Sequence, residues 1–140
     1  MTVDRNYGSA TGPSKHVPHV VVWDDDGTTR SNLAATFHDR GYETEGCGSQ
    51  EDLIEVVLRG TPDVVVYVLR SDPQSDLAVL QLLRRVKPTV PLILVSPDAS
   101  VRVRRSVLDL RPTYFAISPV DGAEMCDAVD AAIHRRRAAS

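Results

Sequence analysis

The sequence predicts an α/β domain with a doubly wound, five-stranded parallel sheet that helices cover on both faces. Short apolar runs alternate five times with longer stretches of helical spacing, between residues 18 and 134. The runs are rich in β-branched residues and lack an alternating polar face, which is the pattern of strands buried on both sides. With 140 residues, 42% hydrophobic and 25% charged, the chain has the composition of one globular domain.

The first predicted strand covers residues 19–23 and ends at an acidic, glycine-bearing turn over residues 24–27. Either Thr28 or Thr29 is expected to cap a helix that runs to about Arg40. A second, weaker strand is expected over residues 42–46. Ser49 is expected to cap the next helix, whose predicted buried face is formed by Leu53, Ile54, Val57 and Leu58.

The run over residues 63–69 is the most valine-rich and predicts the most buried strand. The next helix is expected to begin in the 71–76 segment and to end near Val86, with Leu77, Val79, Leu80, Leu82 and Leu83 as its apolar residues. The remaining elements are a strand over 91–96, an arginine-rich helix over 100–110, a strand over 113–117, and a last helix that opens at 118–121 and carries Met125, Val129, Ala132 and Ile133 on its apolar stripe.

These elements divide the chain into a flexible leader (1–17), one domain (18–137) and a short tail (138–140). The leader is polar and aperiodic, so it cannot offset its own ordering entropy. The 16 basic and 19 acidic residues give a formal net charge of −3, which argues against direct nucleic-acid binding. No apolar run is long enough to span a membrane, and the amino terminus lacks a signal-peptide core. We therefore expect a cytoplasmic protein, with Cys47 and Cys126 as reduced structural thiols.

In a doubly wound sheet, ligands bind outside the carboxyl ends of the strands. The residues at those ends are Asp24 to Asp26 after the first strand, Val68 to Asp72 after the third, Ser96 after the fourth, and Ser118 and Pro119 after the fifth. Three adjacent aspartates are equally consistent with a cation site and with a solvated turn that favours the start of a helix. Tyr67 is interpreted as a core aromatic whose hydroxyl is hydrogen-bonded.

From residue 19 to residue 134 the sequence resembles the receiver domain of bacterial response regulators. The resemblance is carried by Trp23-Asp24-Asp25-Asp26, Pro62-Asp63-Val64-Val65-Val66, Val90-Pro91-Leu92-Ile93-Leu94-Val95-Ser96 and Ser118-Pro119. It implies a flavodoxin-like (βα)5 fold with strand order 2-1-3-4-5 and a role in two-component, phosphorelay signal transduction. It also implies that Asp24 and Asp25 form the acidic pair that holds magnesium, that Ser96 is the hydroxyl residue, and that Phe115 is the switch aromatic.

Two residues that the family's chemistry requires are absent. The phosphoacceptor aspartate falls on Val68 when counted from Pro62, or on Leu69 when counted back from Pro73, and the phosphate-binding lysine falls on Ser118. Phosphoryl transfer to this site needs a carboxylate nucleophile, a magnesium ion and a fixed cation. The sequence therefore predicts an atypical pseudo-receiver that is not an enzyme and requires no cofactor, with weak Mg²⁺ binding by Asp24 and Asp25 possible through water. Asp72 is a remote substitute for the acceptor.

Without phosphorylation, the expected function is protein–protein interaction through the fourth helix, fifth strand and fifth helix, with a protein partner or a second copy of the chain. Arg102, Arg104 and Arg105 lie on the fourth helix, and Glu124, Asp127 and Asp130 lie on the fifth, so a twofold arrangement could oppose these charges. The alternatives are a small-ligand or cation sensor that uses the degenerate pocket, and a conventional phosphorelay receiver. The basic run over 134–137 is expected to be the charged end of a helix rather than a linker to an output domain.

Overall fold

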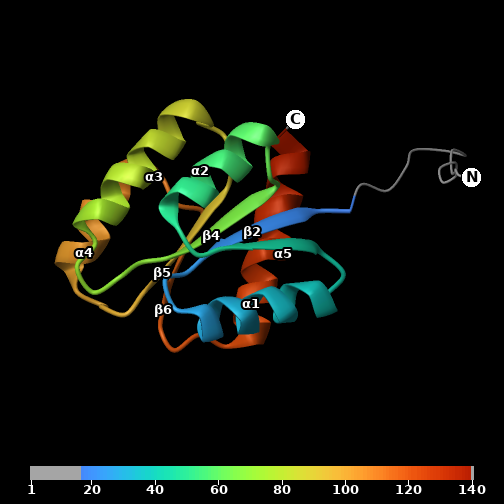
Figure 1. Ribbon diagram of the computed structural model, residues 1–140, viewed down its shortest axis with the longest axis horizontal. Helices are drawn as coiled ribbons and strands as arrows, with labels where there is room; N and C mark the ends of the chain where they lie inside the picture. The colour runs from blue at the N-terminus through green and yellow to red at the C-terminus, as the bar shows by residue number, and fades with distance from the viewer. Residues whose placement is uncertain (1–16, 140) are drawn as a thin grey trace, which may run out of the picture.

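The computed structural model describes residues 17–139, and the side chains of residues 17–136. The predicted leader lies outside the described residues except for Val17. The sheet has five parallel strands in the order β3-β2-β4-β5-β6 (Figure 1). In chain order this is 2-1-3-4-5, so the predicted fold class and topology are confirmed. The strands are β2 (His19–Trp23), β3 (Glu43–Cys47), β4 (Val64–Val68), β5 (Leu92–Ser96) and β6 (Tyr114–Ile117).

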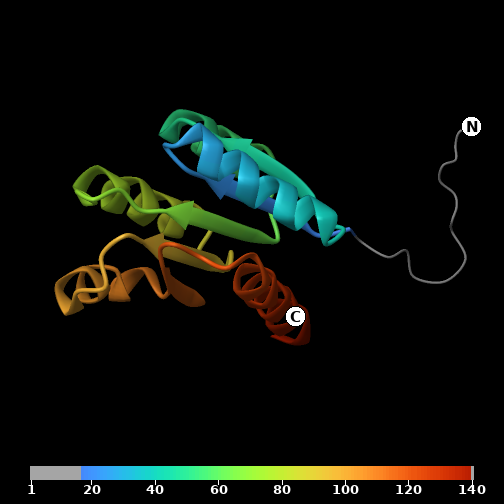
Figure 2. The same ribbon diagram turned by 90° about the horizontal axis from the view of Figure 1, so that it is seen from below.

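Helices cover both faces of this sheet, as Figures 1 and 2 show together. Helices α1 (Gly27–Asp39) and α5 (Gly122–Ala139) pack on one face, and α2 (Gln50–Arg59), α3 (Gln74–Val86) and α4 (Val101–Ser106) pack on the other. Successive side chains of a strand point to opposite faces, so Val20 and Val22 pack toward α1 and α5 while Val21 and Trp23 pack toward the other layer. Burial on both sides explains why the strands carry no polar stripe.

Helices α1 and α2 differ from the prediction in two details. Asp26, and not Thr28 or Thr29, caps α1, because its carboxylate accepts the backbone N–H of Thr29 at 3.3 Å. Ser49 caps α2 as predicted, with its Oγ 3.1 Å from the backbone nitrogen of Asp52. The buried residues of α2 are Leu53, Val56 and Val57, whereas Ile54 is half-buried and Leu58 is 55% exposed. The helix is rotated so that Val56 takes the place assigned to Leu58.

The carboxyl-terminal half also departs locally from the expected elements. In α3 the buried apolar residues are Leu80 and Leu83, while Leu82 is exposed. The predicted fourth helix is divided into the six-residue α4 and the 3-10 helix η1 (Leu108–Leu110), which ends at Arg111 in a left-handed conformation (φ 50°, ψ 56°). The predicted apolar stripe of α5 is buried in full, and α5 continues past residue 137 to Ala139.

Both cysteines are free thiols buried in the core, Cys47 at the end of β3 and Cys126 in α5. Burial raises the pKa of the Cys47 thiol to about 11, so this thiol stays protonated at neutral pH. This agrees with the predicted structural role. Within residues 17–139, no helix is both long enough and apolar enough to cross a membrane.

Candidate functional site

The parallel register brings the segments after β2, β4, β5 and β6 to one edge of the sheet. Trp23 pairs with Tyr67, Val68 with Val95, and Ser96 with Ile117. The residues that follow these pairs are the acidic loop, the β4–α3 loop, the loop before α4 and the Ser118-Pro119 segment. The topology therefore gathers the predicted site residues at the carboxyl edge, where ligands bind in doubly wound sheets.

The three adjacent aspartates of the acidic loop occupy three different environments. Asp24 is only 5% exposed; its Oδ1 accepts the backbone N–H of Asp26 at 2.9 Å, while its Oδ2 is buried without a hydrogen-bond partner. Burial raises the pKa of Asp24. Asp25 is exposed. Asp26 is also exposed and caps α1, and its hydrogen bonds from the hydroxyl and backbone N–H of Thr29 lower its pKa. Of the three aspartates, only Asp24 has a buried carboxylate oxygen without a hydrogen-bond partner.

Val68 and Leu69 lie on opposite sides of the sheet edge. Val68, the last residue of β4, is half-buried and lines a cavity of about 590 Å³ together with Asp24 and Ser118. Leu69 is buried in the layer of α2, α3 and α4, and its outer atoms border a shallow hollow beside the three aspartates. Whichever of the two positions is compared with the family's acceptor, the side chain is hydrocarbon. Asp72, the remote substitute, is exposed on the rim of that hollow.

The hydroxyl and switch positions already have partners within the chain. Ser96 is buried, and its Oγ donates to the carbonyl of Asp98 at 2.9 Å and accepts the N–H of Asp98 at 3.0 Å. The Oγ of Ser118 donates weakly to the carbonyl of Ser96 at 3.4 Å. Phe115 is half-buried, and the guanidinium carbon of Arg104 lies 4.9 Å from its ring centroid, in cation–π range. The lysine position therefore carries a hydroxyl, and Phe115 is covered by an arginine.

Two arginines that the sequence analysis did not single out flank the acidic loop. Arg30 of α1 donates from Nη1 to the carbonyl of Asp24 at 2.7 Å. Its side chain lies against Gly46 and Gly48, where a Cβ on Gly48 would meet Nη1 at 2.9 Å. Arg70 borders the same hollow as the aspartates, and its guanidinium lies 5.3 Å from the Trp23 ring centroid. The chain thus places its own cations beside the acidic loop.

A buried polar network also went unrecognised in the sequence. Asp76 of α3 is fully buried and accepts the Tyr67 hydroxyl at 2.7 Å, together with the Nη2 of Arg70 at 2.7 Å and the backbone N–H of Arg70 at 2.9 Å. The Tyr67 ring stacks on Trp23 with 4.4 Å between centroids. The interpretation of Tyr67 as a core aromatic with a bonded hydroxyl is confirmed. Burial raises the pKa of Tyr67, so its hydroxyl remains a donor.

The residues at this edge do not fit a tightly held magnesium ion. Within residues 17–139, no group of three or more His, Cys, Asp or Glu side chains could hold a metal. The site offers one buried oxygen from Asp24 and the exposed carboxylate of Asp25, while Val68 and Leu69 supply no ligand. Magnesium requires a near-octahedral shell of oxygens, so most of that shell would have to be water. Weak, water-mediated binding by Asp24 and Asp25 stays a prediction.

By fold, the chain resembles the receiver domains of response regulators. It superimposes on the receiver domain protein of Methanospirillum hungatei with a TM-score of 0.83 and 13% identity, covering 89% of this chain and all of that one. A receiver protein from Pseudomonas putida gives a TM-score of 0.75 at 25% identity, covering 84% of this chain and 99% of that one. No family model matches the sequence.

The sequence has curated relatives among transcriptional regulators. It is 28% identical over 120 residues to the transcriptional activator protein PfeR of Pseudomonas aeruginosa, which covers 86% of this chain and 39% of PfeR. It is 25% identical over 126 residues to the transcriptional regulatory protein GlrR of Escherichia coli, which covers 86% of this chain and 27% of GlrR. The chain thus spans well under half the length of these relatives.

Proposed function

We propose that this receiver domain transmits signals by protein–protein interaction without being phosphorylated, and that it is not an enzyme. The observation that carries the proposal is the side chain of Val68, which lines one cavity with Asp24 and Ser118. A phosphoryl group needs an oxygen nucleophile at that position, and a methyl group cannot supply one. Fold and sequence similarity to response-regulator proteins support a place in two-component signalling.

The electrostatics of the site also oppose a stable phosphorylated state. Catalysis of phosphoryl transfer depends on metal ions and fixed cations that neutralise charge on the transferred group. Here the lysine position is Ser118, and the Arg70 guanidinium is bound to Asp76. A phosphoryl group placed beside Asp24 would face that carboxylate, and position 118 would supply no cation to compensate the charge.

We propose α4, β6 and α5 as the face that binds a protein partner. Three large apolar side chains are exposed around α4 and β6: Val101 (66%), Leu108 (64%) and Tyr114 (36%). Exposed arginines (Arg102, Arg104 and Arg105) lie on α4, and acidic residues (Glu124, Asp127 and Asp130) lie on α5. An apolar centre with charged edges is the usual composition of a protein interface.

Incubation with acetyl phosphate and Mg²⁺, followed by intact-mass measurement, tests the absence of phosphorylation. We expect the wild-type chain to gain no phosphoryl group. The matched variant Val68→Asp, Ser118→Lys supplies the nucleophile and the cation, and we expect it to gain one phosphoryl group per chain. Beryllofluoride titration, followed by a change in Trp23 fluorescence, should likewise saturate only for the variant.

A phosphoryl adduct on the wild-type chain would contradict the proposal and favour a conventional phosphorelay receiver. Mapping the modified residue by peptide mass spectrometry would then decide whether Asp72 or another carboxylate is the acceptor. An Asp72→Asn variant that loses the adduct would identify Asp72.

One observation favours a second candidate function, a sensor of a small cation. The Oδ2 of Asp24 is buried without a hydrogen-bond partner, and Asp24 lines the 590 Å³ cavity together with Thr29, Asn32 and Thr36. An ammonium group or a metal ion would satisfy that oxygen. Thermal-shift measurements with Mg²⁺, K⁺, spermidine and amino acids test this function, because a ligand of the folded state raises Tm. The shift must vanish in Asp24→Asn to support a sensor.

A further inference from the structure

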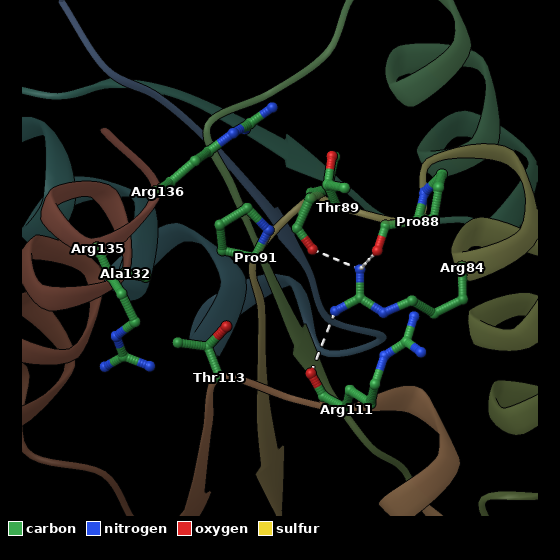
Figure 3. A pocket seen from close by; sticks show the side chains of 10 residues that line it. Arg84, Pro88, Thr89, Pro91, Arg111, Thr113, Ala132, Arg135 and Arg136 are labelled. Carbon is green, nitrogen blue, oxygen red and sulfur yellow. Dashed lines mark hydrogen bonds between the residues drawn. The ribbon is translucent and has the colours of Figure 1, made fainter. Parts of the chain in front are cut away.

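A second cavity lies at the opposite, amino-terminal edge of the sheet, and it is strongly basic. It measures about 560 Å³ and is bordered by the end of α3, the segment before β5, the turn before β6 and the end of α5 (Figure 3). Four arginines line it: Arg84, Arg111, Arg135 and Arg136. No aspartate or glutamate is among its lining residues in the described part of the chain.

Among residues 17–136, whose side chains the structure describes, no ion pair involves any of these four arginines. The ion pairs found there involve His19 and three other arginines, at positions 40, 59 and 70. The guanidinium of Arg84 is partly buried, and both burial and the nearby Arg111 lower its pKa. Two like charges held close together without a carboxylate raise the local positive potential, which an anion would relieve.

Arg84 is held in place by backbone groups and forms the fixed wall of the cavity. Its Nε donates to the carbonyl of Leu110 at 2.6 Å, and its Nη1 donates to the carbonyls of Pro88 and Val90 (Figure 3). These bonds occupy carbonyl oxygens that would otherwise repel an anion. The guanidinium of Arg136 is similarly anchored on the carbonyl of Pro62 at 2.9 Å.

Arg111 and Arg135 are exposed, and their side chains donate no hydrogen bond within the described residues. Arg111 has φ of 50°, a conformation that costs energy for a residue with a Cβ, and it carries its guanidinium to the side of Arg84. The cavity therefore combines anchored positive charges with two guanidinium groups whose donors are available.

We propose that this cavity binds a small molecule bearing several phosphate groups. Guanidinium groups bind phosphate oxygens in a bidentate manner, and several of them around one hollow suit a polyphosphate better than a single anion. The hydroxyls of Thr89 and Thr113 add donors, and the rings of Pro88 and Pro91 give an apolar wall. A volume of about 560 Å³ is that of a small-molecule site, and the concave shape favours such a ligand over an extended nucleic acid.

Isothermal titration calorimetry of the full chain with sodium tripolyphosphate, ATP and adenosine tests the proposal. We expect saturable one-to-one binding of tripolyphosphate and ATP that weakens with added NaCl, and none of adenosine. The variant Arg111→Asn, Arg135→Gln removes the two available guanidinium groups, and asparagine tolerates the left-handed backbone at position 111. We expect at least about tenfold weaker binding, because charge-assisted hydrogen bonds are lost.

The matched control is Arg59→Gln, Arg85→Gln, which removes two exposed arginines outside both the cavity and the proposed α4–β6–α5 face. Its affinity should equal that of the wild type. Arg135→Gln alone, on the exposed surface of α5, keeps the test available if the double variant does not fold, and it should weaken binding by about threefold. Absence of saturable binding, equal losses in the cavity and control variants, or tighter binding of a DNA duplex than of tripolyphosphate would each overturn the proposal.

Discussion

Asp24, Asp25 and Asp26 show how strongly position changes the role of one residue type. Asp24 is enclosed at the end of β2, Asp25 faces solvent, and Asp26 caps α1. Burial without a full set of hydrogen bonds raises the pKa of Asp24, whereas hydrogen bonds from Thr29 lower the pKa of Asp26. Their contributions to stability therefore depend on pH with opposite signs.

Asp24→Asn should increase the free energy of unfolding at pH 7 by about 1 kcal/mol, because it removes a buried charge that lacks a full set of partners. The raised pKa of Asp24 means that the folded state binds its proton more tightly than the unfolded state. The loss of stability that ionised Asp24 causes in the wild type therefore develops as pH rises through its raised folded-state pKa. It is absent at pH values below the pKa of Asp24 in the unfolded chain. In urea unfolding, Asp24→Asn should be more stable than the wild type at pH 7 but not at pH 3.5.

Asp25→Asn is the control for this comparison, since Asp25 is exposed and should change stability little at either pH. A wild-type chain that is more stable than Asp24→Asn at pH 7 would show that the Asp24 carboxylate has a partner, such as a bound cation.

Asp76→Ala should lower the free energy of unfolding by about 3 kcal/mol, because it leaves the Tyr67 hydroxyl and the Arg70 guanidinium without their shared acceptor in a buried site. Tyr67→Phe removes one donor and keeps the aromatic stack, so it should cost only about 1 kcal/mol. Chemical denaturation of both variants measures the difference. Equal losses would show that the tyrosine hydroxyl carries most of the network's stabilisation.

The residue-level roles were only partly predictable from sequence. Asp24 and Ser118 could be placed at the site because they end strands of a recognisable order. Asp76 could not be recognised, because an aspartate in the first turn of a helix usually favours the dipole from the surface. Its burial depends on Tyr67 and Arg70, which approach from another element. Arg30 was missed for the same reason, since its contact with Gly48 is tertiary.

At the scale of elements, Arg30 links α1 to the turn after β3. Its guanidinium occupies the space beside Gly48 and hydrogen-bonds the carbonyl of Asp24. The helix assignments show the same dependence on neighbours. The apolar periodicity placed α2 correctly but not its rotation, because Val56 and Leu58 satisfy similar patterns and only the sheet decides which one is buried.

Gly48→Ala should lower the free energy of unfolding by about 1 kcal/mol, because the new methyl group displaces Arg30 from the Asp24 carbonyl. In an Arg30→Ala background the same substitution should cost almost nothing, since the obstructing side chain is gone. A double-mutant cycle by thermal unfolding measures this coupling. Gly60→Ala is the control: no atom lies within 4 Å of its added Cβ, and its backbone is extended, so no loss is expected. If Gly48→Ala lowers stability equally in the wild type and in Arg30→Ala, the loss arises from the backbone of the turn and not from contact with Arg30.

At the scale of the whole molecule, the strand order followed from the alternation of elements and the family resemblance, because a sheet covered on both faces needs continuous apolar strands. The basic cavity was not predictable, since its arginines come from residues 84, 111, 135 and 136, which meet only when α3, η1 and α5 pack around the sheet. The division of the predicted fourth helix at Val107 was missed as well, because the apolar spacing does not distinguish an α-helix from a 3-10 turn that follows it.

The proposed α4–β6–α5 face predicts a homodimer with opposed charges. Of the acidic residues of α5, Asp130 pairs with Arg40 and Glu124 accepts the Tyr114 hydroxyl, both within the chain. Asp127 is exposed and remains for Arg102 and Arg105 of a second copy. A twofold axis would place α4 of each copy against α5 of the other. We therefore expect sedimentation equilibrium to show a dimer that dissociates as NaCl is raised.

Charge reversal tests the pairing directly. Arg102→Glu, Arg105→Glu makes both helices acidic, and Glu124→Lys, Asp127→Lys makes both basic, so each variant alone should be monomeric because like charges face each other. An equimolar mixture restores opposite charges at both contacts and should form a heterodimer of nearly wild-type affinity. A wild-type chain that is monomeric at high micromolar concentration would exclude the homodimer and leave the exposed Val101, Leu108 and Tyr114 for a different protein partner. If each variant is monomeric and their mixture also stays monomeric, the wild-type dimer does not pair α4 of one copy with α5 of the other. The same face would then pair in another arrangement.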